Sequence, residues 1–346
     1  MILKIKNRIE EELKNYTTTF DKIYGLNRIS GLLYTNITEF ISRSGKRVRP
    51  ILFCLGYLGF KNRPPAGFYR SALSMELIHD FLLVHDDIID RSLLRRGKPS
   101  MHAKLNKYLK GLKNVKFTGE DLGIVIGDVM YAMALDAFMS IKENPLQKEK
   151  ALKKLIAAGL YTGAGEFIEL IYGASDIEKI TPKDIYNIYD LKTANYTFSF
   201  PLTTGATLAG ADEKEIKLLF DYGNYLGRAF QIKDDIIGIF SSESEIGKSN
   251  LTDLQEAKKT ILIWHAFHHT NRNGKITIKS ILDKKDLTTY DLHKMRKIIT
   301  EAGTLLYADK EIQTLVKKAK HTLNRSKMSG KYKNILNNYI SEILKL

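Results

Sequence analysis

Apolar residues recur at positions i, i+3, i+4 and i+7 through most of the 346-residue chain. This spacing places them along one face of an α-helix. Alternation of apolar and polar residues is scarce, and KITIKSIL at 275–282 is the main ambiguous stretch. We therefore predict an all-α protein. The expected helices lie near 3–19, 29–43, 48–60, 65–91, 98–110, 120–143, 146–172, 182–209, 212–241, 251–271, 287–301, 304–325 and 329–345.

The chain has no internal boundary that its composition reveals. Its length could fit two domains, but no Gly/Ser/Pro-rich linker divides it, and 44% hydrophobic residues can build a substantial core. We expect a single domain over residues 1–346. Pro201 lies inside an expected helix, where a kink is the natural outcome.

The chain is expected to be soluble and cytoplasmic. Uninterrupted apolar runs fall short of the roughly 18 residues that a membrane-spanning helix needs, so we predict no transmembrane segment. The N-terminal segment MILKIKNRIEEELKNY lacks the apolar core of a secretory signal. The single cysteine, Cys54, excludes internal disulfides and cysteine-rich metal sites.

A formal net charge of +15 indicates an anionic partner. Nucleic acid, a membrane surface and a phosphorylated small molecule all satisfy that charge. Many lysines have the spacing of solvated faces of amphipathic helices, so charge alone does not choose among these partners.

The segment HDDIID, residues 85–90, places three acids at the end of an apolar helix. Residues four apart share a helix face, so Asp86 and Asp90 project together, while Asp87 is rotated by about 100°. Neighbouring carboxylates in a partly apolar cleft are costly unless a positive charge neutralises them. Carboxylate oxygens suit Mg²⁺. A solvated acidic helix end is the alternative for this cluster taken alone.

A second segment, GRAFQIKDDIIGIF, repeats the pattern with Asp234 and Asp235. Gly238 occupies the position four residues after Asp234, so this helix offers fewer carboxylates and is expected to hold fewer ions. Protein-bound Mg²⁺ usually keeps waters and is completed by substrate phosphates. Two such helices in a basic protein predict a diphosphate held between them.

Basic residues accompany both acidic clusters, as diphosphate binding requires. Arginine's planar fork suits phosphate oxygens, and a helix start offers free N–H groups to an anion. SGKRVRP at 44–50 is a further basic segment before a helix; within it Arg47 is expected to be a solvated charge. The candidates are Lys46, Arg49, Arg95, Arg96, Lys233, Lys248, Lys258 and Lys259.

Five segments together resemble the trans-isoprenyl diphosphate synthases, or polyprenyl synthase family. In chain order they are GKRVRP, ELIHDFLLVHDDIIDRSLLRRGKPSMH, LKTANYTFSFPL, GRAFQIKDDIIGIF and GKSNLTDLQEAKKTIL, from Gly45 to Leu262. The resemblance implies an all-α fold of about ten to fourteen helices around a central cavity, as a homodimer. It also implies head-to-tail condensation of isopentenyl diphosphate with an allylic diphosphate, namely dimethylallyl, geranyl or farnesyl diphosphate.

The resemblance also implies roles for individual residues. Those implied to bind Mg²⁺ are Asp86, Asp87, Asp90 and Asp234. Those implied to contact the allylic diphosphate are Arg95, Lys192, Lys248 and Lys258. Those implied to bind the diphosphate of isopentenyl diphosphate are Lys46, Arg49, His79 and Arg96. Thr193 and Gln231 would line the reaction centre. We expect catalysis to depend most on Asp86, Asp90, Lys192, Thr193, Gln231 and Asp234.

Phe81 is the candidate floor of a product tunnel. It precedes Asp86 by five positions, about 7.5 Å along the helix axis. An aromatic residue there, with no insertion within the aspartate segment, resembles the archaeal-type geranylgeranyl diphosphate synthases. Ordinary core packing is the competing interpretation of Phe81.

Four alternatives remain at the level of sequence. A farnesyl or longer polyprenyl diphosphate synthase would keep the fold and change the product. A non-catalytic subunit of a heteromeric synthase is opposed by the intact acids and by Arg95 and Arg96. A nucleic-acid-binding protein would need a recognition motif that the sequence lacks. Terpene cyclases share an aspartate-rich helix but lack the GKxxRP segment and the arginine pair.

Overall fold

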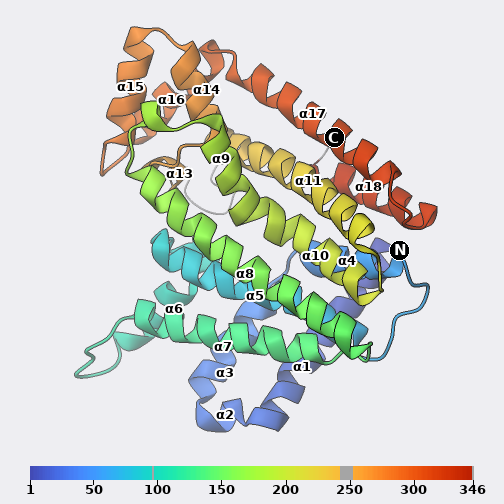
Figure 1. Cartoon of the computed structure of the whole chain (residues 1–346). Helices are drawn as coiled ribbons and strands as arrows, with labels where there is room; N and C mark the ends of the chain where they lie inside the picture. The colour runs from blue at the N-terminus through green and yellow to red at the C-terminus, as the bar shows by residue number, and fades with distance from the viewer. Residues whose placement is uncertain (96, 242–251, 345–346) are drawn as a thin grey trace. The chain divides into compact units, whose positions relative to one another are not determined.

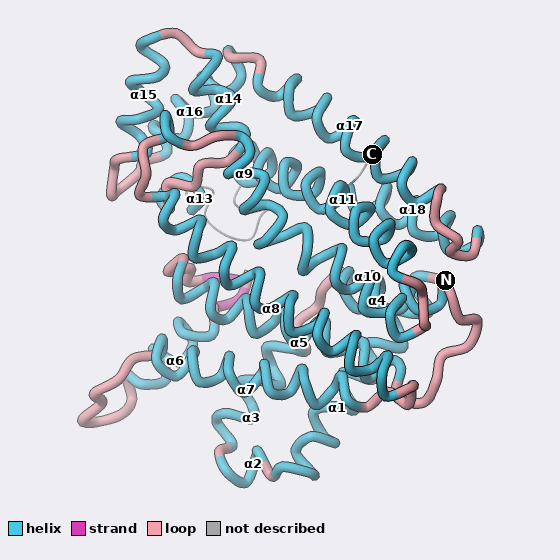
Figure 2. Tube along the Cα trace, viewed as in Figure 1, coloured by secondary structure: helices cyan, strands magenta, loops and turns pink. Residues whose placement is uncertain are grey.

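The computed structural model describes residues 1–95, 97–241 and 252–344. The all-α prediction is confirmed: helices carry nearly all the regular structure of these residues, and strand colour marks a single short hairpin (Figure 2). The hairpin pairs β1 (Leu94–Arg95) with β2 (Lys98–Pro99). The ambiguous stretch KITIKSIL is helical and lies in α15 (Arg272–Leu282).

The described residues fall into two compact units. The first comprises Met1–Gly159, Phe200–Ile216 and Lys327–Tyr339, and the second comprises Leu160–Ser199, Lys217–Ser326 and the chain from Ile340. Three helices contribute residues to both units: α8 (Pro145–Gly173), α11 (Glu213–Phe240) and α18 (Gly330–Leu344). The expectation of one domain over the whole chain stays a prediction.

The first unit is built on close contacts between helices. Its other helices are α1 (Ile2–Tyr24), α2 (Leu26–Ile29), α3 (Gly31–Ile41), α4 (Val48–Leu58), α5 (Phe68–Ile89), α6 (Met101–Leu109), α7 (Gly119–Met139) and α10 (Phe200–Leu208). A Cβ on Gly205 would lie 2.0 Å from the carbonyl oxygen of Phe53, so α4 and α10 meet backbone to backbone. Helices α5 and α7 lie side by side (Figure 1).

The second unit contains the remaining elements. They are η1 (Ile177–Lys179), α9 (Pro182–Tyr189), the π-helix η2 (Asp190–Ser199), α13 (Thr252–Gln255), α14 (Ile261–His269), α15, α16 (Thr289–Glu301) and α17 (Thr304–Asn324). Thr181 caps α9 in a capping box with Asp184, and Pro182 occupies the first turn. Both features fix where α9 begins.

Two of the expected helices are not continuous α-helices in the structure. The helix predicted for 182–209 changes to π-helical hydrogen bonding over Asp190–Ser199, and Pro201 is the second residue of the α-helix α10 that follows. The missing N–H of Pro201 therefore falls at a change of helix type. The continuous helix predicted for 251–271 is wrong: α13 and α14 are separated by a turn in which Ala257 has φ 51°. A positive φ is costly for alanine and incompatible with an α-helix.

Among the described residues, two helices are long and apolar enough to cross a membrane. In the most apolar windows of α7 and α8, 44% and 22% of the residues are buried. Core helices of soluble proteins meet the same criterion, so the predicted absence of a transmembrane segment stays a prediction.

His265 lies in an aromatic stack within the second unit. Its ring stacks against His269 at 3.9 Å and against Tyr307 at 4.1 Å between ring centroids. Its Nδ1 lies 2.9 Å from Thr304 Oγ1. Burial, with the nearby His269 and His268, lowers the pKa of His265 from 6.5 to about 4. The folded protein therefore favours the neutral imidazole.

This stack predicts a pH-dependent part of stability. Between about pH 4 and pH 6.5 the unfolded chain binds more protons at His265 than the folded chain does, so the free energy of unfolding should rise with pH across this window. His265→Gln should flatten that rise. Urea unfolding of the wild type and the variant at pH 5 and pH 8 measures the free energy of unfolding that the substitution removes. At pH 8 the histidine is neutral in both states, so the loss there reports only the missing packing. An equal loss at both pH values would contradict the prediction.

Candidate active site

The first acidic cluster occupies the C-terminal end of α5. Asp86 and Asp90 are partly exposed, and a carboxylate oxygen of each lies within 4.8 Å of one on the other. Asp87 is fully buried. The expected helical geometry therefore holds: two acids share one side, and the third points into the protein.

Arg95 neutralises this cluster from the hairpin that follows α5. Its Nε donates to Asp87 Oδ1 at 2.8 Å, and its Nη2 donates to Asp86 Oδ2 at 3.0 Å. Burial raises the pKa of Asp87 to about 6, and the adjacent guanidinium opposes that rise. The pairing of β1 with β2 holds Arg95 beside the acids.

The chemistry of this cluster fits a magnesium ion. Asp87 Oδ2 is buried and has no hydrogen-bond partner in the described part of the chain. A buried carboxylate oxygen without a partner is costly. The partly exposed carboxylates beside it supply hard oxygen donors, which Mg²⁺ prefers.

The basic segment at the start of α4, residues 44–50, contains one buried and two accessible cations. Lys46 is exposed and Arg49 is partly exposed. Arg47 is 2% exposed, so the expectation of a solvated charge is wrong. Its Nε donates to Glu10 Oε1 at 2.8 Å and its Nη1 donates to Glu76 Oε1 at 2.7 Å.

Arg47 fixes the shape of this segment. Its Nη2 also donates to the carbonyl oxygens of Ile41 and Arg43, at 3.3 and 2.8 Å. Its φ of 54° lies in the left-handed region, which these contacts stabilise. Through Glu76, Arg47 ties the segment to α5, the helix that also carries the acidic cluster and the buried His79.

Phe81 is half-buried on α5. Its ring centroid lies 5.4 Å from that of Tyr131 on α7 and 4.8 Å from that of His85. Phe81 and Tyr131 therefore form a continuous aromatic surface. Their arrangement leaves both the tunnel-floor and the packing interpretation in place.

The second acidic cluster, in the second unit, separates its two acids. Asp234 is exposed, whereas Asp235 is 4% exposed. Asp235 accepts hydrogen bonds from Gln231 Nε2, at 2.8 Å, and from the Tyr189 hydroxyl. Thr193 Oγ1 donates to Gln231 Oε1 at 2.6 Å. The two predicted reaction-centre residues, Thr193 and Gln231, are thus in direct contact.

Lys192 lies between two acids that the sequence analysis missed. Its Nζ is 2.5 Å from a carboxylate oxygen of Glu166 and 2.5 Å from one of Glu169, both on α8. A Cβ on Gly165 would lie 2.9 Å from Lys192 N, so a glycine is needed for this approach. In the sequence, the segment GEFIEL already places Glu166 and Glu169 three residues apart, a spacing that puts both acids on one side of a helix.

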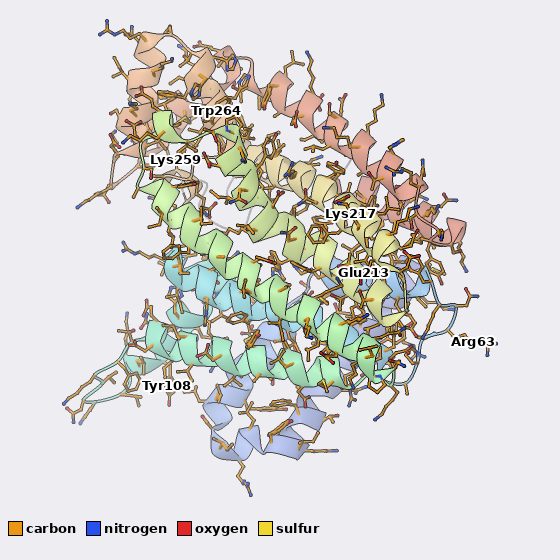
Figure 3. The ribbon with its side chains drawn as sticks, viewed as in Figure 1. Arg63, Tyr108, Glu213, Lys217, Lys259 and Trp264 are labelled. Carbon is orange, nitrogen blue, oxygen red and sulfur yellow. The ribbon has the colours of Figure 1, made fainter. Side chains whose placement is uncertain are left out.

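The turn between α13 and α14 carries two different lysines. Lys258 pairs with Glu256 and has 16% of its side chain exposed. Lys259, labelled in Figure 3, is 8% exposed and donates to the carbonyl oxygen of Gly173. Burial lowers the pKa of Lys259. Two predicted anion-binding residues, Arg96 and Lys248, lie outside the described residues.

The predicted site residues divide between the two units. Those in the first unit are Lys46, Arg49, His79, Phe81, Asp86, Asp87, Asp90 and Arg95. Those in the second are Lys192, Thr193, Gln231, Asp234 and Lys258. Within each unit the acids and cations lie on neighbouring elements, and their functional roles stay predictions.

The sequence pattern of the polyprenyl synthetase family matches residues 30–299 of this chain. The chain belongs to the polyprenyl synthetase family. It is 30% identical to a short chain isoprenyl diphosphate synthase of Methanocaldococcus jannaschii, over 85% of this chain and 81% of the relative. It is 31% identical to the geranylgeranyl diphosphate synthase of Saccharolobus solfataricus, over 88% of this chain and 84% of the relative.

A solved structure shares the fold of this family member. Geranylgeranyl pyrophosphate synthase from Corynebacterium glutamicum, complexed with isoprenyl diphosphate and magnesium, superposes with a TM-score of 0.88 at 22% identity. The match covers 99% of this chain and 98% of that one. Family membership and fold together make the chain a prenyltransferase with an all-α isoprenoid synthase fold.

The buried Arg47 gives a stability prediction. Arg47→Gln should lower the free energy of unfolding by about 3–5 kcal/mol, because Glu76 would keep a buried charge without its partner. Urea unfolding followed by circular dichroism measures the change. Arg8→Gln, which breaks the exposed Arg8–Glu11 pair, is the matched control and should have little effect. Equal effects of the two variants would contradict the role of Arg47.

Proposed function

We propose that this prenyltransferase is a Mg²⁺-dependent synthase that condenses isopentenyl diphosphate head-to-tail with allylic diphosphates to give geranylgeranyl diphosphate. The observation that carries the proposal is the acidic end of α5, where two partly exposed carboxylates adjoin Asp87 and Arg95. The Corynebacterium glutamicum structure contains isoprenyl diphosphate and magnesium, which supports this ligand pair.

Asp86, Asp87 and Asp90 would hold Mg²⁺, and Asp234 would hold a further ion. Bound Mg²⁺ supplies positive charge that stabilises a departing diphosphate. The partly exposed carboxylates attract this charge, and the buried Asp87 keeps one oxygen without a hydrogen-bond partner among the described residues. Arg95, Lys192, Lys248 and Lys258 would contact the allylic diphosphate, whose charge suits these cations.

The reaction breaks the allylic C–O bond and forms a C–C bond. The diphosphate leaves with the bonding electron pair, and the positive charge develops on the allylic carbon. Thr193 and Gln231 offer oxygen atoms to that charge. The double bond of isopentenyl diphosphate supplies the electrons for the new bond, and the proton then lost goes to the released diphosphate. Exclusion of water protects the cation.

The second substrate would be oriented by the basic segment at the start of α4. Lys46, Arg49, His79 and Arg96 would bind the diphosphate of isopentenyl diphosphate. Lys46 and Arg49 are accessible to a ligand, and the buried Arg47 between them holds the backbone of the segment. A fixed segment lowers the entropy cost of orienting the substrate.

Phe81 would set the length of the product. Its ring lies on α5, the helix that carries the acids, and contacts the ring of Tyr131 on α7. A farnesyl or longer polyprenyl product is the second candidate, because the Methanocaldococcus jannaschii relative is described only as a short chain synthase.

We further propose a soluble cytoplasmic homodimer that does not bind nucleic acid.

One assay tests the proposed activity. The purified protein is incubated with Mg²⁺, labelled isopentenyl diphosphate and, in turn, dimethylallyl, geranyl and farnesyl diphosphate. Chromatography of the dephosphorylated alcohols should show a twenty-carbon product that requires Mg²⁺. A fifteen-carbon or longer main product would replace the geranylgeranyl assignment, and no product with any primer would favour a non-catalytic subunit.

Asp86→Ala tests the acidic cluster. It should lower kcat by about 10²–10³-fold or more, because a carboxylate that holds the metal is lost. The same assay at saturating Mg²⁺ measures it. Asp309→Ala removes an exposed aspartate of α17 and should leave kcat unchanged. Full activity of Asp86→Ala would rule out the metal role of Asp86.

Phe81→Ala tests the tunnel floor. Removal of the ring should extend the apolar space beside Tyr131, so products longer than twenty carbons should accumulate. Chromatography of the alcohols reads out the length. Phe117→Ala removes an exposed ring and should leave the product unchanged. An unaltered product from Phe81→Ala would exclude Phe81 as the floor.

A further inference from the structure

Four hydrogen bonds connect a backbone amide to the predicted reaction centre within the second unit. Ile261 N–H, at the start of α14, donates to the Tyr189 oxygen at 2.9 Å. The Tyr189 hydroxyl donates to Asp235, which also accepts from Gln231 Nε2 at 2.8 Å. Thr193 Oγ1 completes the chain by donating to Gln231 Oε1 at 2.6 Å.

Each bond in this chain has a forced direction. A backbone N–H can only donate, so the Tyr189 oxygen accepts from Ile261 and directs its own hydrogen at Asp235. Burial and the adjacent Asp235 hold the pKa of Tyr189 well above its usual range, so the hydroxyl keeps that hydrogen. A carboxylate only accepts, so Gln231 must turn its NH₂ group toward Asp235. Its amide oxygen therefore faces Thr193.

Close packing fixes the distance between α11, which carries Gln231 and Asp235, and η2, which carries Thr193. A Cβ on Gly227 of α11 would lie 2.2 Å from Ala194 Cα on η2, and a Cβ on Gly223 would lie 2.7 Å from Ser199 Cα. The π-helical segment and α11 therefore touch through their backbones. Tyr189 and Asp235 are 5% and 4% exposed, so water competes little for their hydrogen bonds.

We propose that Asp235 and Tyr189 are positioning residues, which orient Gln231 and Thr193 so that their oxygen lone pairs face the developing allylic cation. This inference rests on the proposed function. Asp235 then differs in role from Asp234, the exposed neighbour proposed to hold an ion: Asp235 is buried, and both of its carboxylate oxygens accept hydrogen bonds from protein side chains. A pre-oriented dipole stabilises charge without reorganising during the reaction.

The main test compares turnover with binding. Tyr189→Phe and Asp235→Asn should each lower kcat by about 10–100-fold, because the amide of Gln231 is no longer held in one orientation. Binding of a non-ionising allylic thiodiphosphate with Mg²⁺, measured by calorimetry, should stay within about threefold of wild type. Asp234→Asn, in contrast, should weaken that binding.

A charge swap provides a readout that a packing role would not give. In Asp235→Asn the new amide can direct its NH₂ group at residue 231, which turns the Gln231 NH₂ toward Thr193. Adding Gln231→Glu restores a side chain that only accepts hydrogen bonds. The new amide at position 235 and the hydroxyl of Thr193 can then both donate to it. The double variant should regain at least about tenfold in kcat over Asp235→Asn alone.

Tyr222→Phe is the matched control. Tyr222 is buried on the same helix as Gln231, and its hydroxyl has no hydrogen-bond partner among the described residues, so kcat should stay within about twofold. Thermal unfolding of every variant confirms the fold. Absence of turnover in wild type would reject the proposed function and this inference with it. If the wild type turns over, two results would reject the inference alone. One is an unchanged kcat in folded Tyr189→Phe and Asp235→Asn. The other is a loss of analogue binding in Asp235→Asn that equals the loss in Asp234→Asn.

Discussion

A charge that is removed from water needs a partner within the protein. This constraint shapes three charged segments, those of Arg47, Asp87 and Asp235. Arg47 is buried against Glu10 and Glu76, Asp87 against Arg95, and Asp235 against Tyr189 and Gln231. Beside each buried group lies a more accessible one: Lys46, Asp86 and Asp234. Each buried group is held by partners within the protein, and we propose that the accessible neighbour contacts the ligand. Loss of a buried partner leaves a charge that is costly to keep in the interior.

The pairing of buried with accessible charged groups links the fold to the proposed chemistry. In the first unit, Arg47 and Arg95 connect the basic segment and the hairpin to the helix that carries the acids. In the second unit, the series of four hydrogen bonds from Ile261 N–H to Thr193 connects α14, α9, α11 and η2. Each unit therefore holds its share of the charged groups in a defined orientation. Groups oriented in advance stabilise developing charge better than groups that must reorganise.

The helical fold and the family could be predicted from the sequence because apolar periodicity and ordered motifs are local signals. The break between α13 and α14 could not, because Ala257 adopts a positive φ that its identity does not favour. The burial of Arg47 was also missed, since its partners Glu10 and Glu76 are distant in sequence. For the same reason Glu166 and Glu169 were not connected to Lys192. Adjacent aspartates such as Asp234 and Asp235 look alike in sequence, and burial alone separates them.

The central claim is that Asp86, Asp87 and Asp90 hold the metal, whereas the buried Asp235 orients side chains of the protein. A crystal structure with Mn²⁺ in place of Mg²⁺ and a non-ionising allylic thiodiphosphate tests it directly, because anomalous scattering locates the metal. We predict manganese ligated by Asp86, Asp87 and Asp90, a further manganese ion at Asp234, and Asp235 still hydrogen-bonded to Tyr189 and Gln231. Manganese ligated by Asp235, or no manganese at the end of α5, would contradict it.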